Sequence, residues 1–321
     1  GTVSFATRLD FSTAQEPRGL ALVDLDGDGK LDIATTGGNL NQIAFTVLRN
    51  ASTNGNVSFE TKIETNTTAA TYSIASADID GDGKEDLIFG GSKMIIFPNI
   101  STVGSITFGT PIDFTAAVNV NAIAIADIDG DAKKDICITA GSTVSVFRNT
   151  STVGAISLAT KVDFAAPQAY GITIGDWDGD NKLDIAASLL NTTNTLSIFT
   201  NTSTVGNIGF ATRIDNNSPQ NPYFVAGGDL NGDGKVDLVT TNAGQNGTAA
   251  NLSVYRNTST TGVASFASNV DLALGSWPYY AAIGDIDGDG KPDIVSSSVE
   301  ANKIAIFRNN PQFQTINSSG T

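Results

Sequence analysis

Short apolar stretches of about five residues recur along the chain, separated by clusters of Gly, Asn, Ser and Thr. No stretch combines the 3.6-residue apolar period of a helix with capping residues, so the chain is predicted to be all-β. The first stretch of each repeating unit consists mainly of Ala, Ile and Gly, which suits a strand crowded near an axis. These first stretches are 19–23, 73–77, 122–126, 171–175, 224–228 and 280–284.

Three further strands are predicted in each unit, and each has its own marker. The second begins with an aliphatic residue directly after an acidic loop, at Ile33, Leu87, Ile136, Ile185, Leu238 and Ile294. The third ends in a turn Asn, as in 47–50, 146–149 and 306–309. The fourth is assigned to a Ser-Phe-Ala-Thr-like phrase, whose large apolar residue is Phe5, Phe59, Phe108, Leu158, Phe210 or Phe266.

The units repeat at the spacing of propeller blades. Their acidic loops, 24–32, 78–86, 127–135, 176–184, 229–237 and 285–293, begin 54, 49, 49, 53 and 56 residues apart. Four antiparallel strands per unit of this size predict one domain, 1–321, that folds as a six-bladed β-propeller. The alternative is a six-unit excerpt of a seven-bladed ring.

The two ends of the sequence predict how the ring closes. The N-terminus carries a fourth-strand phrase without the first three strands, and the last unit has three strands without that phrase. We therefore expect the N-terminal strand to complete the last blade, leaving 311–321 as a C-terminal tail.

The acidic loop reads Asp-x-Asp-Gly-Asp-Gly-Lys-x-Asp at its first appearance and predicts a calcium site. Carboxylates at positions 1, 3, 5 and 9 supply hard oxygen ligands, and the glycines let the chain wrap tightly. Position 7 is Lys in every copy, and its side chain cannot bind calcium, so we expect its backbone carbonyl to do so. Magnesium fits less well because it demands a strict octahedron and keeps its water. Zinc and copper lack their usual ligands here, because the chain has no His and no loop Cys.

Up to six Ca²⁺ ions are therefore expected, one per blade. The predicted ligands are Asp24, Asp26, Asp28, Lys30 and Asp32; Asp78, Asp80, Asp82, Lys84 and Asp86; Asp127, Asp129, Asp131, Lys133 and Asp135; Asp176, Asp178, Asp180, Lys182 and Asp184; Asp229, Asn231, Asp233, Lys235 and Asp237; and Asp285, Asp287, Asp289, Lys291 and Asp293.

The six loops are not equivalent. Ala132 replaces a Gly that is expected to be left-handed, at a cost of about 1–2 kcal/mol, and Asn181 tolerates that conformation better. Asn231 keeps an oxygen at position 3 but loses a charge. We expect the third and fifth sites to be the weaker ones.

The net charge of −15 comes mostly from these loops, so it indicates metal ligation rather than a field for basic partners. No basic stripe suits nucleic acid, and no run of 18 apolar residues suits membrane insertion. Cys137 is the only cysteine, and a small buried residue is its simplest interpretation. A disulfide-free chain with calcium loops suggests a secreted or cell-surface setting, of bacterial type, within a longer secreted chain.

The acidic loops, together with the Ser-Phe phrases, resemble the FG-GAP/VCBS repeat family. That family includes the calcium-bearing blades of integrin alpha subunits and a fungal propeller lectin. The loop and linker sequences of this chain are most similar to those of secreted bacterial members. The resemblance implies a propeller, structural calcium at the loop Asp residues and a role in adhesion or glycan binding. The chain departs from the best-known relatives in having six copies and no inserted adhesion domain.

The sequence does not favour an enzyme. Without His there is no Ser-His-Asp or Cys-His arrangement. Acids that recur five residues after the fourth-strand phrase are interpreted as structural; they are Asp10, Glu64, Asp113, Asp163, Asp215 and Asp271. The acids that are left, Glu16, Glu60, Glu85 and Glu300, form no obvious pair, and glycosidic cleavage normally needs two carboxylates.

A ligand site is predicted where the innermost strands begin, at the end away from the acidic loops. The position six residues before each loop is variable and chemically rich, and Trp277 lies nearby; these rim residues are Arg18, Tyr72, Asn121, Tyr170, Tyr223, Tyr279 and Trp277. Flat aromatic faces with polar tips suit a sugar. The prediction is a non-catalytic recognition or adhesion module, most simply for carbohydrate. The alternatives are a protein-adhesion or spacer module that uses the outer hairpins, and an accessory or catalytic propeller of a polysaccharide-degrading enzyme.

Overall fold

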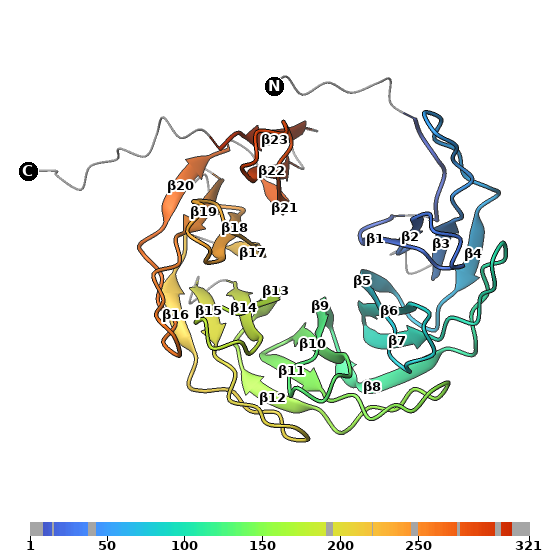
Figure 1. Cartoon of the computed structure of the whole chain (residues 1–321), viewed down its shortest axis with the longest axis horizontal. Coiled ribbons are helices and arrows are strands. Elements are labelled where there is room, and N and C mark those ends of the chain that lie inside the picture. Colours follow the sequence, from blue (N-terminus) through green and yellow to red (C-terminus); the bar gives the residue numbers. More distant parts are fainter. Residues whose placement is uncertain are drawn as a thin grey trace, which may run out of the picture.

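The computed structural model describes residues 9–14, 16–37, 43–190, 195–219, 221–244, 250–274, 277–298 and 303–309. Within these residues the chain forms 23 strands in six antiparallel sheets and no helix, as predicted. The sheets are arranged around a common centre as a six-bladed propeller (Figure 1). Among the described residues, no helix has the length and hydropathy needed to cross a membrane.

The first three blades each contain four strands in sequential order. They are β1 (Leu20–Val23), β2 (Asp32–Thr35), β3 (Ala44–Leu48) and β4 (Ile63–Asn66); β5 (Thr71–Ala77), β6 (Asp86–Gly91), β7 (Lys93–Phe97) and β8 (Ile112–Val118); and β9 (Val120–Ala126), β10 (Asp135–Ala140), β11 (Thr143–Phe147) and β12 (Val162–Ala165).

The last three blades follow the same order, and three strands of the sixth are described. They are β13 (Ala169–Gly175), β14 (Asp184–Leu189), β15 (Thr195–Phe199) and β16 (Ile214–Asn217); β17 (Pro222–Gly228), β18 (Asp237–Asn242), β19 (Asn251–Tyr255) and β20 (Val270–Ala273); and β21 (Pro278–Gly284), β22 (Asp293–Ser298) and β23 (Lys303–Phe307).

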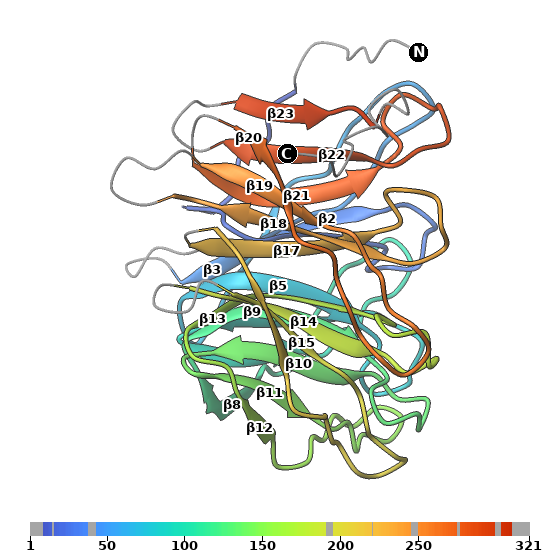
Figure 2. The same ribbon diagram turned by 90° about the vertical axis from the view of Figure 1, so that its left-hand side faces the viewer.

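The innermost strand of each blade contacts the innermost strand of the next, from β1 through β5, β9, β13 and β17 to β21. Figure 2 shows the strands of successive blades running in similar directions, so equivalent turns lie at the same end of the molecule. Every acidic loop joins the first two strands of its blade, as predicted. All acidic loops therefore lie at one end, and the starts of the innermost strands lie at the other.

The hydrophobic core lies between the blades. The second strand of a blade is buried on both faces, because its alternate side chains point toward the preceding and the following blade. In β6, Leu87 and Phe89 pack with Phe45 of the first blade. Ile88 points the other way and packs with Ile136 of the third blade. Near-continuous apolar second and third strands follow from this arrangement.

The sequence-based assignment of the fourth strand is wrong in position. Phe59 and its equivalents form isolated bridges to the turn Asn of the third strand, inside a hairpin extension. The outermost strand begins four residues later, at Ile63 in the first blade. The repeated acid lies on this strand, where Asp163 Oδ1 accepts a hydrogen bond of 2.5 Å from Ser145 Oγ of the third strand. Asp215 and Asp271 bond a third-strand serine in the same way, and Asp113 bonds Lys93 of the third strand. These four acids are structural, as predicted, but they pair strands rather than close turns.

The predicted N-terminal closing strand and the tail 311–321 lie outside the described residues. The first and sixth blades face each other across the open side of the ring in Figure 1. Leu22 in β1 is 58% exposed and Ile304 in β23 is 69% exposed. Third-strand residues equivalent to Ile304 and Ile306 in inner blades are fully buried; they are Met94, Ile96, Val144, Val146, Leu196 and Ile198. The first and sixth blades thus present the two halves of one more blade-to-blade junction.

We expect these two halves to pack against each other in solution, because burying apolar area drives the other five junctions. Cysteines at Asn54 and Gly288 should then be joined within one molecule by a short bifunctional thiol reagent. Gly81 and Val153 occupy the equivalent places in an inner junction and give the control pair, since a Cβ on Gly81 would lie 3.9 Å from Val153 Cγ2. Cys137 is buried and its thiol pKa is raised by that burial, so it should not react. Cross-links only between molecules, or only in the control pair, would contradict the prediction.

Candidate functional site

The acidic loop is held by its own backbone amides. In the first blade, Gly27 N and Asp28 N donate to Asp24 Oδ1 at 2.9 and 3.2 Å, and Gly29 N donates to Asp24 Oδ2 at 2.8 Å. The same three bonds to the first Asp occur in the other five loops. The carboxylate at position 1 therefore organises the turn as a multiply bonded acceptor.

This turn requires a left-handed backbone at positions 4 and 6. Gly27 and Gly29 have φ of 75° and 84°. Ala132 and Asn181 at position 6 have φ of 68° and 67°, so the predicted strain at Ala132 is present in the structure. The loop keeps the same hydrogen bonds in both blades, because the neighbouring interactions fix its shape.

The carboxylate at position 9 is buried beneath the loop. Asp32 Oδ2 accepts a bond from Leu25 N at 2.9 Å, and its Oδ1 accepts one from Asn50 N at 2.8 Å. Burial is the main cause that raises the pKa of the equivalent Asp86 and Asp135 to about 6 and that of Asp184 to about 7. These groups therefore link the loop to the strand that follows it, and their charge is costly in the absence of a cation.

Carboxylate oxygens converge in five of the loops. In the first four, one oxygen each from positions 1, 3 and 9 lie within 4.8 Å of one another, and in the sixth they come from Asp285, Asp287 and Asp289. Within the described residues, the fifth loop gives no such group of three acids, because Asn231 stands at position 3. Converging hard oxygens fit Ca²⁺ in chemical type, and the fifth loop is the poorest donor set. Whether position 7 contributes its carbonyl stays a prediction.

The lysine at position 7 turns its side chain away from these acids. Lys133, Lys182 and Lys235 donate from Nζ to the carbonyl oxygens of Ser151, Ser203 and Ser259, at 2.8, 3.1 and 2.6 Å. These serines lie on the hairpin extension of the same blade. In these three blades the lysine therefore supports the hairpin with its side chain.

From the second blade to the sixth, the turn asparagine joins the acidic loop of its blade to the loop of the preceding blade. Asn99 Nδ2 donates to Leu25 O of the first blade at 2.9 Å and to Glu85 O of its own blade at 3.0 Å. Equivalent bonds to the preceding blade are made by Asn149, Asn201, Asn257 and Asn309. The sequence marked this residue as a turn Asn, and its role between blades was missed because the partner carbonyl lies about 75 residues away in the chain.

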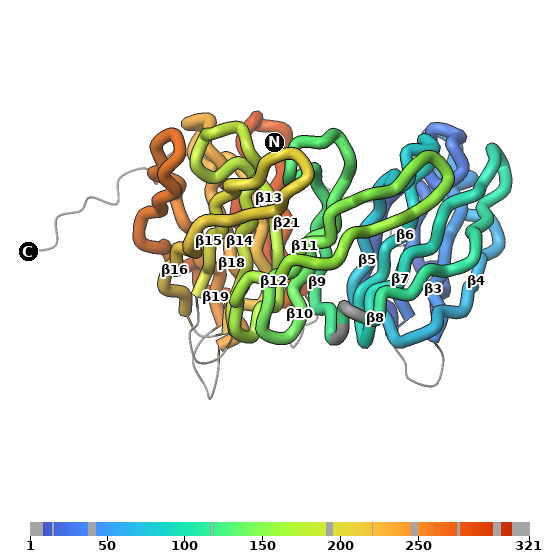
Figure 3. Tube along the Cα trace, turned by 90° about the horizontal axis from the view of Figure 1, so that it is seen from below, coloured from blue at the N-terminus to red at the C-terminus, as the bar shows by residue number. Residues whose placement is uncertain are grey.

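The hairpin extension also reaches the preceding loop. Gly104 N donates to Asp26 Oδ2 at 2.9 Å, and Gly206 N donates to Asp129 Oδ2 at 2.8 Å. Figure 3 shows the hairpins after β11 and β15 leaning over the preceding blade. The carboxylate at position 3 of a loop therefore accepts a hydrogen bond from the hairpin extension of the next blade.

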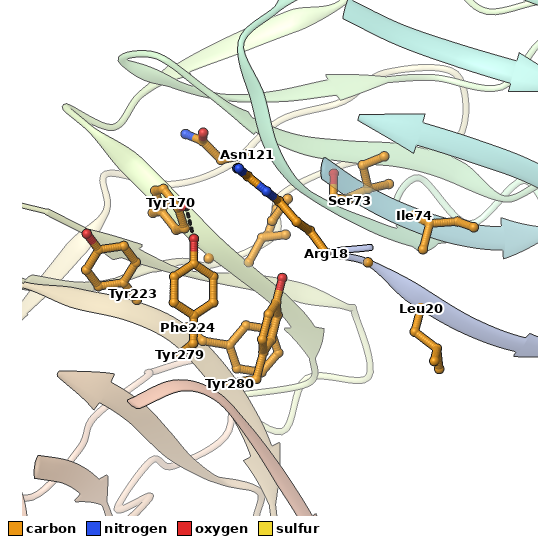
Figure 4. Close-up of a pocket in the computed structure, with 15 residues that line it drawn as sticks. Arg18, Leu20, Ser73, Ile74, Asn121, Tyr170, Tyr223, Phe224, Tyr279 and Tyr280 are labelled. Atoms are coloured by element: carbon orange, nitrogen blue, oxygen red, sulfur yellow. Dashed lines mark hydrogen bonds between the residues drawn. The ribbon is translucent and has the colours of Figure 1, made fainter. Parts of the chain in front are cut away.

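The rim residues come together at the opposite end, around a cavity of about 420 Å³. Figure 4 shows Arg18, Asn121, Tyr170, Tyr223 and Tyr279 on its wall. They lie before β1 or near the starts of β9, β13, β17 and β21. The other two predicted residues support the wall: the Arg18 guanidinium lies 4.9 Å from the centre of the Tyr72 ring, and the Trp277 ring lies 6.0 Å from that of Tyr223.

The tyrosines form one aromatic cluster on one side of the cavity. The ring centres of Tyr170 and Tyr223 are 4.8 Å apart, and those of Tyr223 and Tyr279 are 5.5 Å apart. A hydrogen bond of 2.9 Å joins the hydroxyls of Tyr170 and Tyr279. Burial, aided by that bond, raises the pKa of Tyr170, so its phenol is neutral. Across the cavity stand the Arg18 guanidinium and the Asn121 amide, whose Nδ2 donates to Ala169 O at 2.9 Å.

Among the wall residues that sequence reasoning missed, two are aromatic, Phe224 and Tyr280. Their rings lie 4.9 Å apart. Tyr280 follows a shift in strand register between Pro278 and Ala281, and Phe224 follows the equivalent shift in β17. An irregularity of this kind turns the next side chain toward the channel, and its only signal in the sequence is the aromatic pair itself.

Comparison by sequence identifies the repeat. The family model of the FG-GAP-like repeat matches residues 127–187 and 229–296. Each of these two ranges contains two acidic loops, so four of the six loops are matched. A search of the curated proteins gives no match.

Comparison of structures gives propellers at low sequence identity. A lectin from Agrocybe aegerita, solved for its specific recognition of non-reducing terminal N-acetylglucosamine, is 17% identical, with a TM-score of 0.53, over 91% of this chain and 80% of that chain. A candidate 6-phosphogluconolactonase from Bacteroides uniformis is 14% identical, with a TM-score of 0.64, over 97% of this chain and 84% of that chain. A second one, from Bacteroides fragilis, is 14% identical, with a TM-score of 0.63, over 93% and 82%. At these identities the likeness shows the fold alone: the chain is a six-bladed β-propeller, and its residues 127–187 and 229–296 match the FG-GAP-like repeat.

Proposed function

We propose that this chain is an extracellular, calcium-stabilised recognition module that binds carbohydrate at the rim of its channel without chemical turnover. The observation that carries the proposal is the rim cavity, in which an aromatic cluster faces a guanidinium and an amide. Aromatic rings stack on the apolar faces of sugar rings, and the polar tips bond the hydroxyls. The recognition of N-acetylglucosamine by the Agrocybe lectin lends the proposal support by analogy of fold.

Calcium would be held by the loop carboxylates at positions 1, 3, 5 and 9. The cation would neutralise acids that the fold already gathers, including the buried position-9 carboxylates. Since the empty loop keeps these acids together without a full counter-charge, binding to the folded chain should stabilise it. The repeat type and the acidic groups in the blades support this assignment.

The composition of the rim cavity supports binding rather than catalysis. Its described wall contains Arg, Asn, Ser, Tyr and apolar residues, and no carboxylate. Hydrolysis of a glycosidic bond normally needs two carboxyl groups that flank it. A cavity of this kind can orient a sugar but has no carboxyl group in the described wall to protonate its leaving oxygen.

A second candidate function is protein adhesion through the hairpin extensions. Each extension ends in an exposed side chain next to the acidic loop of the preceding blade. Val103, Val153 and Val205 at these tips are 73%, 78% and 71% exposed, and Val263, two residues after the equivalent Thr261, is 60% exposed. A repeated row of exposed apolar tips suits a protein surface better than a sugar, so the two functions would use opposite ends of the molecule.

We expect Tyr223→Ala to weaken carbohydrate binding at least about tenfold, because the ring between Tyr170 and Tyr279 would be lost. The probe is a glycan array that includes glycans ending in N-acetylglucosamine, followed by titration of the best ligand. Val153→Ala and Val205→Ala at the hairpin tips are matched controls that should bind normally. An array without selective binding by the folded protein would contradict the carbohydrate proposal, and binding lost only in the valine variants would favour protein adhesion.

We expect saturating calcium to raise the melting temperature by more than about 5 °C relative to chelator, with a clear pH dependence. In chelator, Asp86, Asp135 and Asp184 have pKa values of about 6 to 7 in the folded state, above the ordinary value in the unfolded chain. The folded state then binds protons that the unfolded state does not, so metal-free stability should fall as pH rises from about 4 to 7. Calcium requires the ionised carboxylates, and its stabilising effect should grow over the same range.

Thermal unfolding at several pH values, with calcium and with chelator, tests both parts. Magnesium at the same concentration serves as the control for ionic strength and charge. Melting temperatures that coincide in calcium and chelator across this range would contradict the calcium proposal.

A further inference from the structure

The residue directly before the turn asparagine differs among the blades. In four blades it is an arginine, and in the first and sixth blades this arginine bonds two carboxylates of the acidic loop. Arg49 donates from Nε to Asp26 Oδ2 at 2.5 Å and from Nη2 to Asp28 Oδ2 at 2.9 Å. Its side chain is 14% exposed, and that of Asp26 is fully buried. The guanidinium therefore bridges the carboxylates of positions 3 and 5.

The sixth blade repeats this arrangement. Arg308 forms an ion pair with Asp287, and its Nη2 lies 3.2 Å from Asp289 Oδ2. In the third blade, Arg148 Nη1 lies 3.9 Å from Asp131 Oδ2. One position thus places a fixed positive charge against the same two loop positions in separate blades.

Two blades lack this charge, although their loops have the same acids. Pro98 in the second blade and Thr200 in the fourth blade stand where the others have Arg49, Arg148, Arg256 and Arg308. The second and fourth loops gather their position 1, 3 and 9 oxygens as the first loop does. The chain therefore contains loops with the same arrangement of acids, some with an arginine beside the carboxylates and some without one.

We propose that this position sets the divalent-cation affinity of its own loop, with arginine lowering it. The inference rests on the proposed calcium sites. A guanidinium bonded to position 3 and 5 oxygens uses acceptor capacity that the cation needs, and it repels the cation at short range. Loops 2 and 4 are the high-affinity sites, whereas loops 1 and 6 are partly neutralised without metal and fill later. Arg49 acts more strongly than Arg308, because the side chain of Arg308 is 51% exposed and its charge is better screened.

This order refines the ranking made from the loop sequences alone, in which the third and fifth sites are the weaker ones. The arginine adds a separate cause for lower affinity, and it acts in blades whose loop sequence is complete. Loops 3 and 5 combine both causes, since they contain Ala132 and Asn231 and their blades have Arg148 and Arg256 directly before the turn asparagine.

Trp177 makes the fourth loop separately measurable. It occupies position 2 of that loop and is 1% exposed, between the acids Asp176 and Asp178. The other tryptophan, Trp277, lies at the rim on the opposite end. Terbium bound in loop 4 should therefore give luminescence on tryptophan excitation that reports this loop above the others.

The test is to place an arginine where loop 4 has none. Thr200→Arg should raise the terbium concentration needed for half-maximal Trp177-sensitised luminescence about tenfold. Thr200→Gln, which has a long polar side chain without charge, is the matched control and should leave it within about twofold. Equal affinities in the Arg and Gln variants would overturn the proposal.

The reverse change keeps the test independent of whether Thr200→Arg folds. Arg49→Gln should add one high-affinity calcium site in a titration by calorimetry, and Arg213→Gln, whose ion pair with Asp215 lies on the outer strand β16, should add none. An unchanged number of tight sites in Arg49→Gln would overturn the proposal while leaving calcium binding itself intact. An unmodified chain that binds neither terbium nor calcium would instead overturn the proposed metal sites and this inference together.

Discussion

In the second to fifth blades, the hydrogen bonds of one buried asparagine hold successive acidic loops together. Asn149 is 1% exposed, and it donates from Nδ2 to Ile79 O of the preceding blade and to Lys134 O of its own. Its Oδ1 accepts from Ser151 N, and its backbone amide donates to the buried carboxylate of Asp135. Loss of this side chain would leave buried carbonyls unpaired, at a cost of about 1–3 kcal/mol for each group. Because the same group touches two blades, it couples the shape of one loop to the position of its neighbour.

This coupling explains why the loops keep one shape although their sequences differ. Each loop receives amide bonds from its own backbone and from the turn asparagine, and the first four also receive one from the hairpin of the next blade. Ala132 adopts the same left-handed conformation as the glycines, although a Cβ disfavours it, because these partners fix the backbone from both sides. A cation would therefore enter an oxygen-lined turn that the protein has already formed. Differences in affinity between blades should then come from nearby charge and ligand type more than from backbone rearrangement.

Much of the fold is predictable from the sequence because it is repeated. A single loop motif of nine residues marks the first two strands of every blade, and the turn Asn marks the third. The fourth strand was misplaced because the Ser-Phe-Ala-Thr phrase is also apolar and alternating, and its true partner, the turn Asn, forms only an isolated bridge. The five rim positions on the wall were found because they lie at one fixed distance from each loop. Tyr280 also lies at a fixed distance, five residues before its loop, but it was missed because the sequence does not show the register shift beside it. The arginine bridge was missed because nothing local distinguishes Arg49 from a solvated side chain.

The strands between the loop and the rim keep metal binding and recognition apart. Tyr170 is the second residue of β13, and Asp176 directly follows that strand. At about 3.3 Å per residue, the two lie roughly 20 Å apart, far beyond a metal–ligand bond. A cation in the fourth loop could therefore not coordinate a sugar held against Tyr170. It could affect recognition only by stabilising the blades that carry the tyrosines. Charge changes near the loops and aromatic changes at the rim should then act as separate perturbations, since additivity holds for distant sites without shared partners.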